Sequence, residues 1–236
     1  IVLRANWDFH QKLAEFEQWI SRIKESSIPI ENPVHMVEWN LKKSYMVELA
    51  KNGILTPKTF MFDNLESLRQ IYADQQWTTA VLKPIYGASG TFVNRVSFKD
   101  LDEWSQTIYP NRPAEDWLVQ EYLPNITDSG ELSLVFIEGE LSHAVSKVPQ
   151  KGEFRINSQY AGIVEAVEVP STIIDQVQPV QDFIKRRFGA IPLYVRSDGI
   201  VVGDERFCLL ELELNEPTLY YNYVPAAAAT LAEAID

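Results

Sequence analysis

The chain has 236 residues, 46% of them hydrophobic and 23% charged, which is typical of a globular protein with one large core or two small ones. No apolar run approaches the roughly 18 residues of a membrane-spanning helix and no secretory signal is found, so we expect a cytoplasmic protein without a membrane partner. The net charge of −12 argues against nucleic acid as a partner, because nucleic-acid binding needs a basic face. The single cysteine, Cys208, lies in an apolar run, which predicts a buried thiol in a reducing compartment.

The N-terminal part of the chain is predicted to hold a strand over residues 1–5 and a helix over residues 9–23. The helix is predicted because large apolar side chains recur at helical spacing, and Asp8 is predicted to cap it. Since the chain opens without methionine and directly in a strand, we expect that it starts inside a domain. A loop with two prolines, residues 26–33, marks the predicted boundary to the next domain.

A helix is predicted over residues 41–52, with Asn40 as its N-cap and Gly53 at its end. A strand over 59–63, a helix over 65–73 and a strand over 78–84 follow. The last of these strands carries Lys83 near its end and leads into a run of small residues, Gly87, Ala88, Ser89 and Gly90. Small residues let the backbone approach a ligand closely, and backbone amides can surround phosphate oxygens. A lysine directly before such a loop favours a phosphate site over an ordinary tight turn.

The remaining elements are predicted in the same way. Strands are expected over residues 117–123, 132–137 and 141–148, a polar loop over 152–158, and helices over 173–188 and 226–235. Tyr220, Tyr221 and Tyr223 follow the last strand, and we expect them to pack against the final helix rather than to line a substrate pocket. The three histidines are scattered and do not have metal-ligand spacing.

Residues 193–217 are predicted to form a hairpin whose turn centres on residues 204–205. This register places Asp198 opposite Glu211 and Arg196 opposite Glu213 on one face of the sheet. The opposite face of the second strand is predicted to carry Leu210, Leu212 and Leu214. Three carboxylates on one face repel one another unless a cation lies among them, and an all-oxygen ligand set suits Mg²⁺ or Mn²⁺. The alternative is an amphipathic hairpin with a solvated acidic face.

Taken in order, these motifs resemble the ATP-grasp superfamily of carboxylate–amine ligases over residues 32–220. The pattern is a lysine-bearing helix, a strand with lysine before a glycine loop, a QEY strand, a basic segment, and R-x-D and E-x-N on adjacent strands. The chain is most similar to glutathione synthetase-like members and to the cyclo-ligase branch of cycloserine biosynthesis. The stretches that carry this likeness are Trp7-Asp8, Asn32-Pro33, residues 39–45, residues 130–133, Ser142-His143 and Glu211-Leu212-Glu213.

The resemblance implies an α+β ATP-grasp fold in which two α+β subdomains grip ATP. Residues 1–31 would be the C-terminal remnant of a preceding α/β domain. Residues 32–123 would form the first ATP-grasp subdomain, with the lysines and the glycine loop. Residues 124–236 would form the second, with the metal site.

The resemblance also implies the site residues, with ATP and Mg²⁺ or Mn²⁺ as cofactors. The nucleotide would be bound by Lys43, Lys83, Gly87, Ala88, Ser89, Gly90, Gln120, Glu121, Tyr122 and Leu123, with Lys42 as a rival to Lys43. The metal ligands would be Asp198, Glu211, Glu213 and Asn215, and the catalytic residues Arg196, Arg155 and Lys147. The substrate would contact Trp7, Asp8, Arg155 and Asn157. Asn215 is followed by Glu216 and Pro217, where many relatives have small residues.

The implied reaction joins a carboxylate to an amine, in one molecule or between two, through an acylphosphate. The substrate would be a small molecule, an amino acid or a related carboxylic acid, and a homodimer is a candidate assembly. Two alternatives remain open at this point: a kinase that uses the same nucleotide site on a hydroxyl group, and a non-catalytic ATP-binding module.

Overall fold

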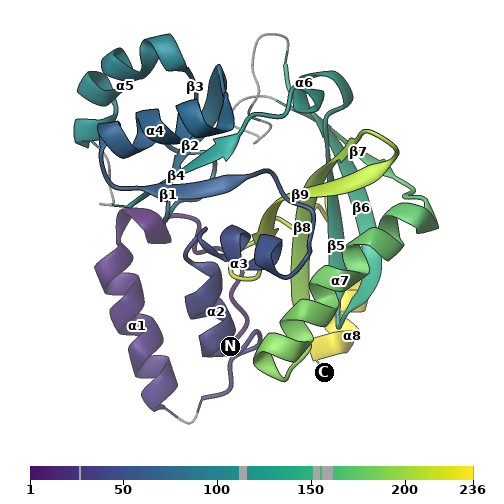
Figure 1. Ribbon diagram of the computed structural model, residues 1–236. Coiled ribbons are helices and arrows are strands. Elements are labelled where there is room, and N and C mark those ends of the chain that lie inside the picture. Colours follow the sequence, from purple (N-terminus) through teal and green to yellow (C-terminus); the bar gives the residue numbers. More distant parts are fainter. Residues whose placement is uncertain (27, 112–115, 151–154, 156–161, 236) are drawn as a thin grey trace.

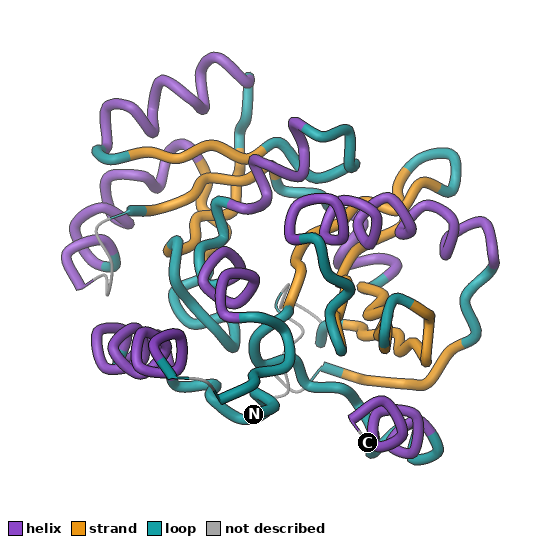
Figure 2. The backbone as a smooth tube through the Cα atoms, turned by 90° about the horizontal axis from the view of Figure 1, so that it is seen from below, coloured by secondary structure: helices purple, strands orange, loops and turns teal. Residues whose placement is uncertain are grey.

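The computed structural model describes residues 1–26, 28–111, 116–150, 155 and 162–235 (Figure 1). Helices surround two antiparallel sheets, one of four strands in the order β1-β4-β2-β3 and one of five in the order β7-β6-β5-β8-β9. This arrangement confirms the expected α+β class. Both chain ends lie away from the first sheet (Figures 1 and 2). None of the helices described is both long enough and apolar enough to span a membrane.

The first sheet has its own hydrophobic core. Its strands are β1 (Thr59–Phe62), β2 (Thr79–Pro84), β3 (Asn94–Ser97) and β4 (Trp117–Glu121). Helices α4 (Leu65–Gln75) and α5 (Leu101–Thr107) pack on it, with short 3₁₀ turns at Phe98–Asp100 and Tyr109–Asn111. The core is rich in aromatic side chains, among them Tyr72, Trp104 and Trp117. Helix α4 begins with a reciprocal capping box between Asn64 and Ser67.

The second sheet is covered on both faces. Its strands are β5 (Glu131–Ile137), β6 (Glu140–Val148), β7 (Ile163–Val167), β8 (Tyr194–Val202) and β9 (Arg206–Glu213), and α6 (Asn125–Ser129) leads into it. Leu134 and Phe136 pack with α7 (Ser171–Phe188), whereas the alternate residues Val135 and Ile137 pack with α8 (Ala227–Ile235). Cys208 is buried on this sheet as expected, and burial raises the pKa of its thiol to about 12.

Helices α2 (Val34–Asn40) and α3 (Tyr45–Lys51) differ from the single helix expected over 41–52. Asn40 is the last residue of α2 and caps nothing, because its amide bonds the backbone of β9, donating to Leu212 O at 2.8 Å and accepting from Leu214 N at 2.7 Å. Buried residues of α2 and α3 join the core of the second sheet. The division at residues 31 and 123 stays a prediction.

The start of the chain also differs from expectation, since residues 1–6 form no strand. The chain start instead hydrogen-bonds to the loop before α2, where Glu31 N donates to Ile1 O at 2.8 Å. A 3₁₀ turn, Phe9–Gln11, comes before α1 (Leu13–Glu25). Asp8 makes no capping bond and pairs with Lys12 at 3.1 Å instead.

Candidate active site

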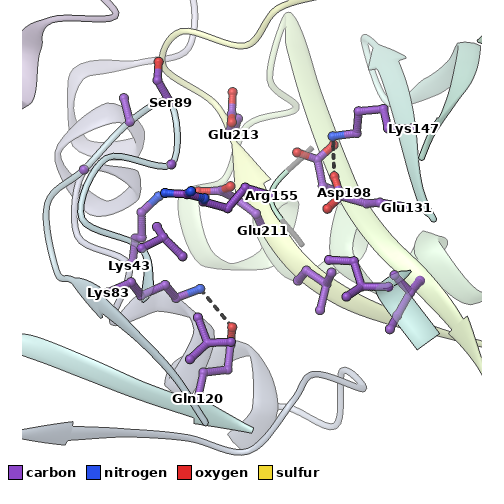
Figure 3. A pocket seen from close by; sticks show the side chains of 18 of the residues that line it. Lys43, Lys83, Ser89, Gln120, Glu131, Lys147, Arg155, Asp198, Glu211 and Glu213 are labelled. Carbon is purple, nitrogen blue, oxygen red and sulfur yellow. Dashed lines mark hydrogen bonds and ion pairs between the residues drawn. The ribbon is translucent and has the colours of Figure 1, made fainter. Parts of the chain in front are cut away.

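A pocket lies between the two sheets and is lined by both of them (Figure 3). The first sheet and its loops contribute Lys83, Gly87, Ala88, Ser89, Gly90, Gln120, Glu121, Tyr122 and Leu123. The second sheet and flanking segments contribute Lys43, Lys147, Arg155, Arg196, Asp198, Glu211 and Glu213.

Lys83 ends up inside the pocket because β2 carries it into the junction between the sheets. Its Nζ donates to Gln120 Oε1 at 3.0 Å, and Gln120 is held in turn by Thr59 Oγ1 at 2.9 Å (Figure 3). Only 8% of Lys83 is exposed, and this burial lowers its pKa to about 8. A phosphate group that met this ammonium would replace a weak neutral partner by a charged one.

Of the two lysines before α3, only Lys43 faces the pocket. Its ammonium forms an ion pair with Glu211 of β9, and although burial opposes its charge, this carboxylate outweighs burial and raises its pKa. Lys42 lies over the ring of Tyr86, 5.6 Å from the centroid, and does not line the pocket. The structure therefore favours Lys43 as the phosphate-binding lysine.

The glycine loop closes one side of the pocket with tight turns. Ser89 has a φ of 56° and Gly90 a φ of 69°, and the amide of Thr91 donates to Ala88 O at 3.2 Å. Positive φ values of this kind are typical of tight turns, and they let the loop backbone double back beside the pocket.

The acidic hairpin has the predicted register at the pocket end. Asp198 pairs with Glu211 and Arg196 with Glu213. Asp198, Glu211 and Glu213 each offer a carboxylate oxygen, and these oxygens lie within 4.8 Å of one another. Across the described residues no other group of at least three His, Cys, Asp or Glu side chains is this compact.

A β-bulge in this hairpin corrects the expected position of Leu210. Asp198 opposes Glu211 but its neighbour Gly199 opposes Leu209, so Leu210 is an extra residue in β9. Leu210 consequently lines the pocket with Ile200, whereas Leu209, Leu212 and Leu214 enter the core. The bulge thus gives the pocket an apolar wall beside its carboxylates.

A chain of ion pairs connects the charged groups of β5, β6, β8 and β9. Lys147 pairs with Glu131 and lies 3.6 Å from Asp198. Arg196 joins Asp198 at 2.7 Å to Glu213 at 2.5 Å. Burial works against the charge of Asp198, but Arg196 and Lys147 outweigh it and hold its pKa at about 2. Burial, only partly offset by Arg196, raises the pKa of Glu213 to about 7.

The three grouped carboxylates fit a divalent metal ion of the Mg²⁺ type. Hard cations of this type prefer carboxylate oxygens, and they are bound by one or two carboxylates together with phosphate oxygens. The carboxylates of Asp198, Glu211 and Glu213 already have cationic partners in Arg196 and Lys43. A metal ion therefore competes with these side chains for its ligands.

Comparison with known proteins identifies the family. The profile of the prokaryotic glutathione synthetase ATP-grasp domain matches residues 43–195, which include the two lysines, the glycine loop and the start of the acidic hairpin. The chain belongs to this ATP-grasp family. The cycloserine biosynthesis protein DcsG of Streptomyces lavendulae is 28% identical over the whole chain and 81% of DcsG. A glutathione synthetase of Rhodopseudomonas palustris is 24% identical over 72% of the chain.

Solved structures agree on the ATP-grasp fold. The crystal structure of the D-cycloserine synthetase DcsG superimposes with a TM-score of 0.84 at 22% identity, over 99% of this chain and 83% of that one. A D-alanine–D-alanine ligase from Bacillus anthracis in complex with ATP gives a TM-score of 0.69 at 19% identity, over 91% and 71%. The chain spans about half the length of the glutathione synthetase from Rhodopseudomonas, namely 52%. The expected resemblance is confirmed for both the glutathione synthetases and the cycloserine branch.

Some residues expected in the ATP-grasp site lie outside the pocket. Asn215 does not line it, and its side-chain oxygen accepts from Asn6 Nδ2 at 3.0 Å. Trp7 donates to the backbone oxygen of Glu216 at 2.9 Å, and Asp8 pairs with Lys12. Asn157 lies outside the described residues. The roles expected for these four residues stay predictions.

Among the pocket residues that were not assigned from the ATP-grasp pattern are Glu131 and Tyr220. Glu131 pairs with Lys147, and the only sequence signal for it was its place in the shared stretch 130–133. Tyr220 was expected to pack against the last helix, but it lines the pocket. Its ring lies 5.4 Å from the guanidinium of Arg196 and 5.8 Å from the ammonium of Lys147.

Proposed function

We propose that this protein is an ATP- and Mg²⁺-dependent ligase that joins a carboxylate to an amine through an acylphosphate. The single observation that carries the proposal is the pocket at the junction of the two sheets. It brings together Lys43, Lys83, the glycine loop, Arg196 and three carboxylates. The lysines and the loop lie within residues 43–195, which match the family, and Arg196 and the carboxylates lie in the hairpin that continues beyond residue 195. We place the reaction in the cytosol, in keeping with the free thiol of Cys208.

The nucleotide is bound between the wall of β2 and β4 and the apolar patch of Ile200 and Leu210. Backbone groups of residues 120–123 line this end of the pocket and can hydrogen-bond a purine without any special side chain. Lys83 and the glycine loop then lie toward the phosphates. The cations at the opposite end of the pocket stabilise the charge that spreads over the transferring phosphoryl group.

The reaction needs no side-chain nucleophile. A substrate carboxylate oxygen attacks the γ-phosphorus of ATP and ADP leaves, giving the acylphosphate; the amine then attacks its carbonyl carbon and phosphate leaves. Arg196, Lys147 and Arg155 neutralise the phosphoryl oxygens, and Lys43 exchanges Glu211 for phosphate. A Mg²⁺ ion on Asp198, Glu211 and Glu213 would supply charge neutralisation between these carboxylates and the phosphates.

A matrix assay of ADP release tests the proposal. The protein is incubated with Mg²⁺-ATP and with acids and amines, singly and in pairs drawn from amino acids and their derivatives. The proposal expects ADP release that requires an acid and an amine group, present in two molecules or in one. Release with an alcohol alone would indicate a kinase. If ATP binds but none of the compounds causes ADP release, the protein would be a binding module.

A pair of variants makes this assay specific for the pocket. Glu213→Gln removes one of the three carboxylates and is expected to lower turnover at least about a hundredfold, since oriented charge of this kind contributes a few kcal/mol. Glu165→Gln changes an exposed residue of β7 and is expected to leave turnover unchanged. Equal activity of the two variants would contradict the assignment of the site.

A further inference from the structure

Tyr220 places an uncharged aromatic ring against two cations of the pocket. The ring centroid lies 5.4 Å from the guanidinium carbon of Arg196 and 5.8 Å from the ammonium nitrogen of Lys147. Both distances are within the range at which a cation is attracted to the face of an aromatic ring. All three residues line the pocket, and Arg196 and Lys147 are buried, which strengthens an attraction of this kind.

The two cations also contact carboxylates. Arg196 donates to Asp198 at 2.7 Å and pairs with Glu213. Lys147 pairs with Glu131 and lies 3.6 Å from Asp198. Asp198 and Glu213 belong to the carboxylate group that fits a metal ion, so these two partners have a competing use. The face of the ring does not compete for a hard cation, which prefers oxygen ligands, so the ring can hold Arg196 and Lys147 while the carboxylates are engaged.

The backbone next to Tyr220 is fixed from two sides. The backbone oxygen of Thr218 accepts from Nη1 of Arg196 at 3.0 Å. Leu219 is 1% exposed, and its backbone oxygen lies 2.7 Å from Nε2 of His143, which is itself buried. Since a carbonyl oxygen only accepts, Nε2 of His143 carries the proton and donates. The guanidinium and the buried imidazole therefore hold the segment that carries the ring.

The neighbouring tyrosines have different surroundings. Tyr221 packs with the core formed with α8, and its ring lies 5.8 Å from that of His143. Tyr223 is 47% exposed. Within the described residues, Tyr220 is the one of these three tyrosines that lines the pocket. Its contact with the two cations is therefore particular to this position and is not a result of general packing around the last helix.

We propose that Tyr220 is a positioning residue that holds the side chains of Arg196 and Lys147 toward the phosphates of bound ATP, and that His143 fixes the backbone of its segment. This inference rests on the proposed function, because it uses the transfer of a phosphoryl group in this pocket. The ring attracts the two cations through its face and takes up none of their hydrogen-bond donors, which stay available to phosphate oxygens. Without the ring, the two cations are free to move toward neighbouring carboxylates, and the terminal phosphate loses part of its charge compensation.

Calorimetric titrations with ADP and with a non-hydrolysable ATP analogue, both with Mg²⁺, measure this role through the terminal phosphate. Tyr220→Leu removes the ring, Tyr220→Phe keeps the ring without its hydroxyl group, and Tyr223→Leu is the matched control on a neighbouring tyrosine outside the pocket. We expect Tyr220→Leu to lower the affinity for the analogue about fivefold or more relative to the affinity for ADP, as for the loss of buried cation–ring contacts. The affinity for ADP itself is expected to stay unchanged, which shows that the pocket is folded. Tyr220→Phe and Tyr223→Leu are expected to keep the wild-type ratio of the two affinities.

A purely structural role of Tyr220 gives a different result, because it would weaken the binding of both nucleotides alike. The inference is overturned if Tyr220→Leu leaves the ratio of the two affinities unchanged or lowers both affinities equally. It is also overturned if Tyr220→Phe lowers the ratio as far as Tyr220→Leu, since the face of the ring is then not what holds the cations, or if the analogue does not bind the wild type.

Turnover in the ADP-release assay provides a second readout. Tyr220→Leu is expected to lower kcat about tenfold or more and Tyr220→Phe to stay within about twofold of the wild type, since a displacement of about 1 Å in a reacting site costs on the order of a hundredfold. Wild-type turnover of Tyr220→Leu would overturn the inference. The two proposals fail separately: a ratio of affinities that depends on Tyr220 in a protein that releases no ADP would remove the ligase proposal and leave this inference, whereas an unchanged ratio in an active ligase would remove this inference alone.

Discussion

Lys83 carries a charge in a place where burial disfavours charge. It is 8% exposed, and within the described part of the chain its ammonium donates a hydrogen bond to a neutral amide, that of Gln120. The nearest compensation is longer-range attraction from Glu211, which Lys43 partly cancels. Residues of this kind are retained where they serve a ligand, so Lys83 is expected to favour function at the expense of folding stability.

Lys83→Met is expected to stabilise the protein at pH 7 and to abolish ATP binding. The pKa of Lys83 is about 8 in the folded protein and 10.5 ordinarily, so the unfolded chain holds this proton more tightly. The charge on Lys83 therefore lowers the free energy of unfolding by about 3 kcal/mol at most. This loss of stability is complete below pH 8 and disappears as the pH rises to 10.5. Urea unfolding at pH 7 and pH 10 should show the advantage of the variant shrinking at the higher pH. A variant less stable than wild type at pH 7 would contradict this.

Asp198 and Glu213 belong to the same group of carboxylates, but their substitution is expected to affect stability differently. Asp198 is 2% exposed and is bonded to Arg196 and Ser133, whereas the side chain of Glu213 is 23% exposed and has one partner. Asp198→Asn should therefore cost about 3–5 kcal/mol, and Glu213→Gln about 1 kcal/mol or less. Both variants should lose ADP release. Equal losses of stability in urea unfolding would show that the buried network does not depend on Asp198.

At the scale of elements, the bulge in β9 divides four nearby leucines between the core and the pocket. Leu209, Leu212 and Leu214 are almost fully buried in the core of the second sheet, while Leu210 faces the nucleotide end of the pocket. A regular strand would alternate its side chains and could not place these residues in this way. The bulge therefore joins the carboxylates of Glu211 and Glu213 to an apolar wall within one strand.

Leu210→Ala is expected to weaken ATP binding several-fold while costing less than about 1.5 kcal/mol of folding stability. Its matched control, Leu212→Ala, removes a core side chain and is expected to cost about 2–5 kcal/mol. Calorimetry with an ATP analogue and urea unfolding on both variants check the difference. If Leu210→Ala were as destabilising as Leu212→Ala, Leu210 would be a core residue and the bulge would lie elsewhere.

The hairpin also shows which features of the site can be predicted from the sequence. Alternation alone predicts that Asp198 faces Glu211 and Arg196 faces Glu213, and this register is present. The sequence around Leu210 does not predict the bulge, because an extra leucine next to other apolar residues is compatible with a regular strand. It also changes the turn, which spans residues 203–205 rather than centring on 204–205.

Other differences arise from contacts between distant parts of the chain. Asn40 is of a residue type that is favoured at helix N-caps, but its side chain bonds the backbone of Leu212 and Leu214. These partners are far away in the sequence, so neighbouring residues cannot predict them. Residues 1–5 have the propensity of a strand, but no strand of the described residues pairs with them, and Ile1 instead hydrogen-bonds to Pro29 and Glu31. The short edge strands β3 and β7 were not predicted from the sequence.

At the scale of the whole molecule, the site depends on two separate cores meeting at one pocket. The aromatic core of the first sheet and the larger core of the second share no residues. Charged side chains of the pocket lie between the two sheets, with Lys83 on one side and Glu131, Lys147 and Asp198 on the other (Figure 3). Arg196 continues this chain of ion pairs through Asp198.

We propose that these ion pairs make metal and nucleotide binding interdependent. A metal ion on Glu211 and Glu213 would displace Lys43 and Arg196 from these carboxylates, and the phosphates of ATP would offer the two cations new partners. Each ligand therefore removes part of the cost of binding the other, and the coupling acts equally in both directions.

The most direct test of this account is a calorimetric titration of the protein with a non-hydrolysable ATP analogue, with and without Mg²⁺. We predict that Mg²⁺ raises the affinity for the analogue about tenfold or more and that Mg²⁺ alone gives no binding signal at comparable concentrations. Lys83→Met should abolish the signal for the analogue. Binding that is the same with and without Mg²⁺, or no binding of the analogue at all, would contradict a metal-dependent ATP site between the two sheets.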